Sequence, residues 1–227
     1  MKRSFPRLSL GGLLAALAAV ACSSATRATM QTGTGSTSGG RVLLSPAERA
    51  KADSGRPPYT AADVYFISGR IGHHAQAVLM AGWAPSHGAS ESVRILCERI
   101  VVAQRDEIAF MQRWLRDRRQ TVPEADATHD MMPGMEHAKM MPGMLTADAL
   151  TELDRARATQ FDRLFLGFMI KHHQGAITMV DQLFGSTGAG QDDAIFKFAS
   201  DVNADQSTEI ERMERMLVAL PAAGKSP

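Results

Sequence analysis

The stretch Thr60–Met80 reads TAADVYFISGRIGHHAQAVLM, and the stretch Thr159–Met179 reads TQFDRLFLGFMIKHHQGAITM. They align without a gap at an offset of 99 residues and are identical at 8 of 21 positions, which include a His-His pair in each copy. Each copy begins with Thr-x-x-Asp, which resembles a capping box, so we expect each to open a helix at an equivalent place. The repeat therefore predicts two helical units of similar structure.

A second repeated pattern follows each copy. The segment Gln104–Met111 (QRDEIAFM) shares Gln-x-x-Glu-Ile-x-x-Met with the segment Gln206–Met213 (QSTEIERM). These spacings place the Gln, Glu and Met on one flank of a helix, and no segment of useful length alternates as a β-strand would. The chain is predicted to be all-α, a four-helix bundle of two repeated helical hairpins at residues 60–120 and 146–220, with a loop at 121–145 and a tail at 221–227.

The composition excludes several classes of protein. Hydrophobic residues make up 44% of the 227 residues and charged residues 22%, with a formal net charge of +1. This balance is that of a soluble globular chain, and it excludes a wholly disordered or a multi-span membrane protein. The charge gives no reason to expect a nucleic-acid partner.

The N-terminal segment predicts export. Residues 1–21 combine a basic start, an apolar run too short to span a bilayer and a small-residue cleavage site, which is typical of a signal peptide. Cys22 follows directly, as in bacterial lipoproteins, so we predict that it is lipidated and anchors a periplasm-facing protein to the outer membrane. The alternative is an ordinary secretory signal cleaved at the same bond, which releases a soluble protein. Residues 22–59 are predicted to form a flexible tether with a short helix.

The loop between the hairpins is rich in methionine. Residues 129–144 contain Met-Met-Pro-Gly-Met twice, and the Pro-Gly pairs prevent a continuous helix. Thioether sulfur is a soft ligand that prefers Cu(I) and Ag(I), and imidazole also suits copper. The alternative is a methionine-rich segment that packs over the bundle. The candidate ligands in the loop are His129, Met131, Met132, Met135, His137, Met140, Met141 and Met144.

The helical His pairs are candidate ligands of a second kind. Adjacent helical residues point about 100° apart, so His73 and His74 can only straddle the inward direction. Met169 and His173 are four residues apart and well placed to share an ion, whereas the first copy has Arg70 where the second has Met169, so the half-sites differ. Glu107 and Glu209 are predicted to orient imidazoles from outside the ligand set. The alternative reading of the His pairs is a polar hydrogen-bond network, and methionines in helix seams are often core residues.

These motifs resemble the family called domain of unknown function 305 (DUF305), over residues 60–117 and 146–220, and the second copy carries the stronger match. The resemblance implies a ferritin-like four-helix bundle that bacteria export, with some relatives associated with copper binding and tolerance. Arg70 departs from the methionine that is usual in the family. The residues that match the positions suspected of binding copper are His73, His74, Met80, Met169, His172, His173 and Met179.

Three functions remain open from the sequence. We predict first an exported protein that sequesters, buffers or hands on a soft metal ion, with copper as Cu(I) and silver as its surrogate, and with a metal-exchange partner protein. The second is a structural or interaction module without a physiological metal, and the third is a metal-dependent redox enzyme. Di-iron bundles need Glu-x-x-His pairs, which the chain lacks, so we expect no enzyme and no organic cofactor. The sequence leaves the oligomeric state open.

Overall fold

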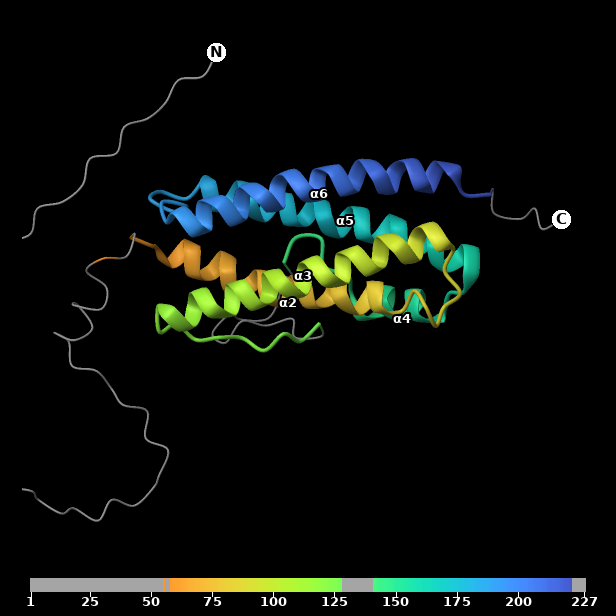
Figure 1. The fold of residues 1–227 in the computed structure, drawn as a ribbon, viewed down its shortest axis with the longest axis horizontal. Coiled ribbons are helices and arrows are strands. Elements are labelled where there is room, and N and C mark those ends of the chain that lie inside the picture. Colours follow the sequence, from red (N-terminus) through yellow and green to blue (C-terminus); the bar gives the residue numbers. More distant parts are fainter. Residues whose placement is uncertain (1–54, 56–57, 128–140, 222–227) are drawn as a thin grey trace, which may run out of the picture. The chain divides into compact units, whose positions relative to one another are not determined.

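The computed structural model describes residue 55 and residues 58–127 and 141–221. Within these ranges the chain is helical and contains no strand. The predicted signal peptide, Cys22 and nearly all of the tether lie outside them. The helices are α2 (Ala61–Gly82), α3 (Glu91–Asp117), α4 (Ala147–Arg155), α5 (Ala158–Phe184) and α6 (Asp193–Ala219), as Figure 1 shows.

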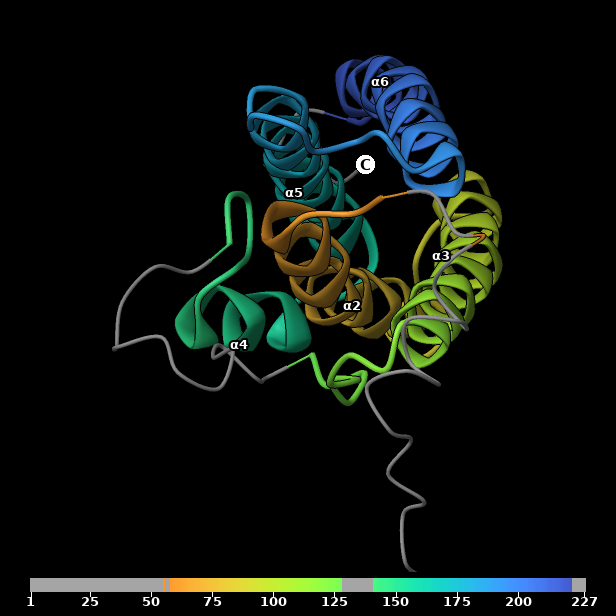
Figure 2. The ribbon, with the colours of Figure 1, turned by 90° about the vertical axis from the view of Figure 1, so that its left-hand side faces the viewer.

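The four long helices form two hairpins. Helix α2 packs along α3, α5 packs along α6, and α2 and α5 contact each other to join the hairpins. Figure 2 shows this arrangement end-on, with the short helix α4 outside the four long ones. The prediction of an all-helical fold from two repeated hairpins is confirmed, but the repeat did not predict α4. None of the described helices is long and apolar enough to cross a membrane.

The two repeat copies begin differently. Thr60 caps α2 with a complete capping box, in which the Asp63 side chain accepts a hydrogen bond from the Thr60 backbone N–H. Helix α5 instead begins at Ala158, so Thr159 lies inside the helix, and Arg157 at the N-cap makes no side-chain capping bond. The expectation of an equivalent second capping box is therefore wrong. The reason is that α5 begins two residues earlier than its alignment with α2 predicts, so Thr159 is not at the N-cap.

The aspartate of each repeat copy also binds the opposite hairpin. Asp162 on α5 accepts a hydrogen bond at 3.1 Å from the backbone N–H of Ser90, in the turn between α2 and α3. Asp63 on α2 accepts one at 2.7 Å from the backbone N–H of Gly190, in the turn between α5 and α6. Each hairpin thus holds the turn of the other through the same repeat position, which gives the bundle approximate two-fold symmetry.

The core contains two apolar clusters. The first joins the C-terminal halves of α2 and α6 to the N-terminal halves of α3 and α5, and the second joins the remaining halves. Cys97 belongs to the first cluster, and burial raises the pKa of its thiol, as expected of a core residue rather than a ligand. Leading members are Met80, Leu96, Phe165, Met169 and Met213 in the first cluster, and Ile67, Met111, Met179, Val180 and Phe198 in the second.

Buried polar side chains gather at mid-length of the four helices, between the residues of the two clusters. Burying a polar group is unfavourable unless a partner compensates it, so a polar set at this depth needs a structural or functional reason. We call these residues the polar layer: Arg70, His73, His74, Gln76, Gln104, His172, His173 and Gln206.

We predict that Asp162→Ala destabilises the fold. The substitution leaves the Ser90 N–H without its acceptor, so the free energy of unfolding should fall by about 1–3 kcal/mol, measured by urea titration. Glu98→Ala, which removes an exposed carboxylate from α3, is the control and should change it little. Equal stability of Asp162→Ala and the native protein would contradict the cross-hairpin role of this carboxylate.

Candidate metal centre

Two histidines from opposite hairpins meet at the centre of the polar layer. The ring centroids of His73 on α2 and His172 on α5 lie 3.8 Å apart, with an angle of 38° between the ring planes. Both side chains are almost completely buried. These residues occupy the same position in the two repeat copies, so the approximate two-fold axis passes between their rings.

The other two histidines are held by carboxylates. His74 Nε2 donates a hydrogen bond to Glu107 Oε2 at 2.5 Å, and His173 Nε2 donates one to Glu209 Oε2 at 2.6 Å. Each pair joins the first helix of a hairpin to its second helix at matched repeat positions. About a quarter of each Glu side chain is exposed, 25% for Glu107 and 27% for Glu209, whereas the histidines are fully buried. The carboxylates therefore form the outer edge of the layer.

These hydrogen bonds define which ring nitrogen is available. His73, His74 and His173 each use Nε2 as a donor, so a neutral ring carries its lone pair on Nδ1. None of these three Nδ1 atoms has a hydrogen-bond partner in the described part of the chain, and the same is true of both ring nitrogens of His172. Metal-binding histidines commonly show this pattern, in which one ring nitrogen donates to a carboxylate or carbonyl and the other binds the metal.

The local electrostatics favour uncharged imidazoles. Burial lowers the pKa of His73, His74 and His172 well below 6.5, and the charge of Arg70 lowers each of them further. Burial also raises the pKa of Glu107, against the effect of Arg70. Near neutral pH these three buried imidazoles are therefore unprotonated bases, which is the state that a metal ligand requires.

A short segment closes one side of the central pair. We call residues 141–145 the strap. It includes the last part of the methionine-rich segment with its second Pro-Gly pair, where Met144 N–H donates to Met141 O at 3.1 Å. His73 Nε2 donates to Pro142 O at 3.0 Å. The Gln76 side chain binds the Leu145 backbone twice. Leu145 N–H donates to Gln76 Oε1 at 2.7 Å, and Gln76 Nε2 donates to Leu145 O at 3.1 Å. The strap is thus fixed to α2 beside His73.

Two helical glycines make room for the strap. A side chain at Gly175 would collide with Pro142 O, and a side chain at Gly69 would collide with the methyl end of Met141. A Cβ atom at Gly69 would also lie 3.7 Å from the methyl carbon of Met179. The methyl ends of Met141, from the strap, and Met179, from α5, therefore lie against α2 at Gly69, one turn before His73.

The remaining predicted ligands are dispersed. Met80 and Met169 are completely buried in the first apolar cluster, whereas Met179 lies in the second, so the structure does not bring these three methionines together. Met144 is partly buried in the strap. Six predicted ligands of the loop lie outside the described residues: His129, Met131, Met132, Met135, His137 and Met140.

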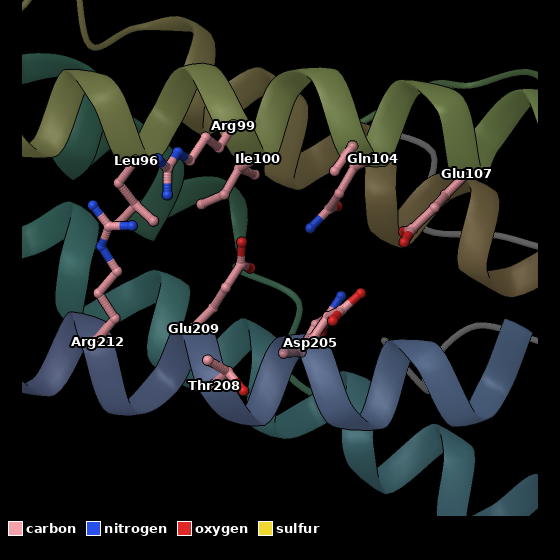
Figure 3. A pocket seen from close by; sticks show the side chains of 11 residues that line it. Leu96, Arg99, Ile100, Gln104, Glu107, Asp205, Thr208, Glu209 and Arg212 are labelled. Carbon is pink, nitrogen blue, oxygen red and sulfur yellow. The ribbon is translucent and has the colours of Figure 1, made fainter. Parts of the chain in front are cut away.

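A pocket of about 270 Å³ lies between α3 and α6. Figure 3 shows Gln104 and Glu107 pointing from α3 toward α6, and Glu209 pointing from α6 toward α3. Because Glu107 and Glu209 also bind the buried histidines, the pocket reaches the outer edge of the polar layer. It provides a polar approach from solvent to that layer.

Imidazole and carboxylate groups alone do not complete a metal site. In the described ranges, no three His, Cys, Asp or Glu side chains are arranged so that they could hold one ion. An ion bound at the central pair would therefore need thioether sulfur as well, which favours a soft metal.

A family model described as Domain of unknown function (DUF305) matches residues 63–217. The chain belongs to the DUF305 family. The resemblance inferred from the repeated His-His and Gln-x-x-Glu-Ile-x-x-Met motifs is thereby confirmed. No curated protein matches the chain.

Several solved structures are similar to this DUF305 chain. A DUF305 fragment from Deinococcus radiodurans is 28% identical with a TM-score of 0.60, and the match covers 72% of this chain and 100% of that one. A Streptomyces coelicolor DUF305 protein, proposed to be secreted, is 26% identical with a TM-score of 0.58, over 69% and 92%. CopM in its Cu(II)-bound form is 29% identical with a TM-score of 0.55, over 69% and 95%. CopM bound to Cu(I), bound to silver and in its apo form also matches.

Sequence reasoning missed the residues that attach the strap. Gln76 and Gly175 occupy the same position in the two repeat copies, and both serve the strap, one by hydrogen bonds and the other by leaving space. The signal in the sequence was Gly175 in the middle of a helix. Glycine there lowers helix stability, so its presence indicates that another segment packs closely against the helix.

We predict that the apo protein loses stability as the pH falls below about 6.5. The unfolded chain takes up protons on His73, His74 and His172, whereas the folded chain excludes them, so acid favours unfolding. Each group should lower the free energy of unfolding by up to about 1.4 kcal/mol per pH unit. Urea titrations of chelator-treated protein between pH 7.5 and 5.5 measure this, and His172→Gln should show a shallower slope. Stability that stays constant over this range would contradict the burial of uncharged imidazoles.

Proposed function

We propose that the protein is an exported binder of soft metal ions that holds Cu(I) in the polar layer, and that it sequesters, buffers or hands on this ion. The observation that carries the proposal is the contact between His73 and His172, whose buried ring nitrogens include three without a hydrogen-bond partner in the described chain. Silver, as Ag(I), would bind in the same way.

The chemistry of the layer fits a soft monovalent cation. Unpaired polar atoms in an apolar core are unfavourable, and a bound ion would satisfy them. Imidazole nitrogen and thioether sulfur suit Cu(I), whereas Mg²⁺ and Ca²⁺ prefer cages of oxygen ligands. Met141 and Met179 meet one turn from His73. Met169 lies one turn before His173 on α5, so thioether sulfur is present near histidines of both hairpins.

The comparison with CopM supports the same metal. Structures of CopM contain Cu(I), Cu(II) or silver, and those matches extend over about 70% of this chain at 27–29% identity. The identity is low, so the ligand set proposed for this chain rests on its own residues.

The methionine-rich loop supplies a second part of the function. Residues 129–140 directly precede the strap, and the strap contacts His73 through Pro142. An ion captured by loop thioethers would thus be delivered beside the polar layer. A signal peptide at residues 1–21 and lipid on Cys22 would place both sites outside the cytoplasm, where a metal-exchange partner protein could receive the ion.

One observation favours the structural alternative. The pairs His74–Glu107 and His173–Glu209 are complete hydrogen bonds that need no metal. They account for the outer edge of the layer as a network that stabilises the bundle. They do not account for the central pair, because both ring nitrogens of His172 lack a partner among the described residues. The proposal includes no catalytic step and no organic cofactor.

We predict that His73→Gln combined with His172→Gln weakens Cu(I) binding by at least about tenfold, because 1.4 kcal/mol of lost ligand interaction already has that effect. The measurement is competition with a colorimetric Cu(I) chelator under reducing conditions. His87→Gln is the matched control, since His87, in the turn after α2, is also buried but binds the backbone carbonyl of Asp154 in α4. Unchanged binding in the double variant, or no binding by the native protein, would contradict the proposal.

We predict that changing the loop methionines at positions 131, 132, 135 and 140 to Leu lowers the number of Cu(I) ions bound without unfolding the bundle. Leucine keeps the apolar volume but removes the sulfur donor. Metal analysis after gel filtration counts the ions, and circular dichroism checks the helices. If the loop only packs over the bundle, the number of ions will not change.

A further inference from the structure

Arg70 is the most unusual residue of the polar layer. Its side chain is completely buried, and its three guanidinium nitrogens have no hydrogen-bond partner in the described part of the chain. An arginine at such depth is normally paired with a carboxylate or with several carbonyls. Its guanidinium carbon lies 5.9 Å from the centroid of the Phe66 ring, a contact that leaves the N–H groups unsatisfied. A buried charge without hydrogen-bond partners calls for an explanation.

The surroundings of Arg70 identify what it supplies. Its charge lowers the pKa of His73, His74 and His172, so it acts on all three. Glu107 is the carboxylate that acts on it in return. Burial lowers the pKa of Arg70 to about 10, which leaves the guanidinium charged at neutral pH. Arg70 is therefore a permanent positive charge among uncharged bases.

The repeat shows what the other hairpin has at the same place. Position 70 in the first copy corresponds to Met169 in the second. The histidines, the carboxylates and the amides of the second helices are matched, since each hairpin contributes two histidines, one Glu and one Gln from its second helix. Gln76 is the exception: it aligns with Gly175, and its side chain binds the strap. The main chemical difference between the two halves is therefore a cation in one and a thioether in the other.

We propose that Arg70 is a built-in cation that takes the place of a metal ion in the first hairpin's half of the polar layer, so that the layer binds one soft ion, on the side of Met169, His172 and His173. This inference rests on the function proposed above and specifies where the ion binds and how many ions the layer accepts.

The size of the electrostatic effect is sufficient. Two unit charges about 6 Å apart, at an effective dielectric constant of about 20, repel each other enough to weaken the binding of a cation on the order of 100-fold. On the other side, Met169 lies three and four residues before His172 and His173, spacings that bring helical side chains together. The charge disfavours an ion in one half, and the sulfur supports an ion in the other.

The test counts ions in the full mature chain. Native protein and variants are loaded with Cu(I), competed with a chelator and analysed for metal per chain. Arg70→Met should bind one more ion than the native protein, because it removes the charge and adds a thioether. Arg70→Leu, which removes the charge without adding a donor, should bind the same number of ions but hold the layer ion more tightly, by less than about 100-fold because that ion lies in the other half of the layer. Met169→Arg should bind one ion fewer.

The matched control is Arg94→Met, which makes the same substitution at an exposed arginine of α3 that does not line the α3–α6 pocket. It should leave the number of ions and the affinity unchanged. If Arg70→Met and Arg70→Leu both behave as the native protein does, the inference is overturned. If instead the native protein loses no ion when His73 and His172 are replaced by Gln, the function proposed for the layer fails.

A second measurement does not depend on metal. Removing a buried charge that has no hydrogen-bond partner should stabilise the apo fold, so Arg70→Leu should unfold at a higher urea concentration than the native apo protein. A lower midpoint would show that the fold requires the guanidinium, and it would overturn its role as a substitute for an ion.

Discussion

The burial of uncharged imidazoles between two apolar clusters is the constraint on which the rest of the structure depends. His73 and His172 are in contact at the centre of the bundle, and the other two histidines are fixed to Glu107 and Glu209. Each hydrogen bond orients a ring and leaves its second nitrogen toward the interior. The layer is costly for the apo fold, since buried polar atoms without partners oppose folding. A bound soft ion would turn the same atoms into a stabilising feature.

The sequence was most informative where the two copies agree. The shared His-His and Gln-x-x-Glu motifs predicted the two hairpins, and they singled out Glu107 and Glu209 as partners of imidazoles without assigning each to its histidine. The repeat gave a wrong prediction at the start of its second copy. Asp162 occupies the same repeat position as Asp63, and each binds the turn of the opposite hairpin. Helix α5, however, begins two residues earlier than the alignment with α2 predicts, so it lacks the expected capping box. Helix α4 has no counterpart in the first half and thus no signal in the repeat.

The site itself was predictable only in part, because sequence spacing does not show which helix faces which. The matched positions of His73 and His172 suggested a common role, but their contact follows from the packing of α2 against α5. The spacing also suggested that Met80 and Met179 were equivalent ligands, whereas they lie in different apolar clusters. The strap was hidden for the same reason, since its contacts with Gln76 and Gly175 join segments far apart in the chain.

The most direct test of the account is the position of the ion. Crystals of the protein loaded with Cu(I) under reducing conditions, with anomalous diffraction recorded at the copper edge, would locate it without reference to any variant. The account predicts an anomalous peak inside the bundle, within bonding distance of a ring nitrogen of His73 or His172 and of a methionine sulfur. Copper found only on the surface, with the two imidazoles still in contact as in the apo fold, would contradict it.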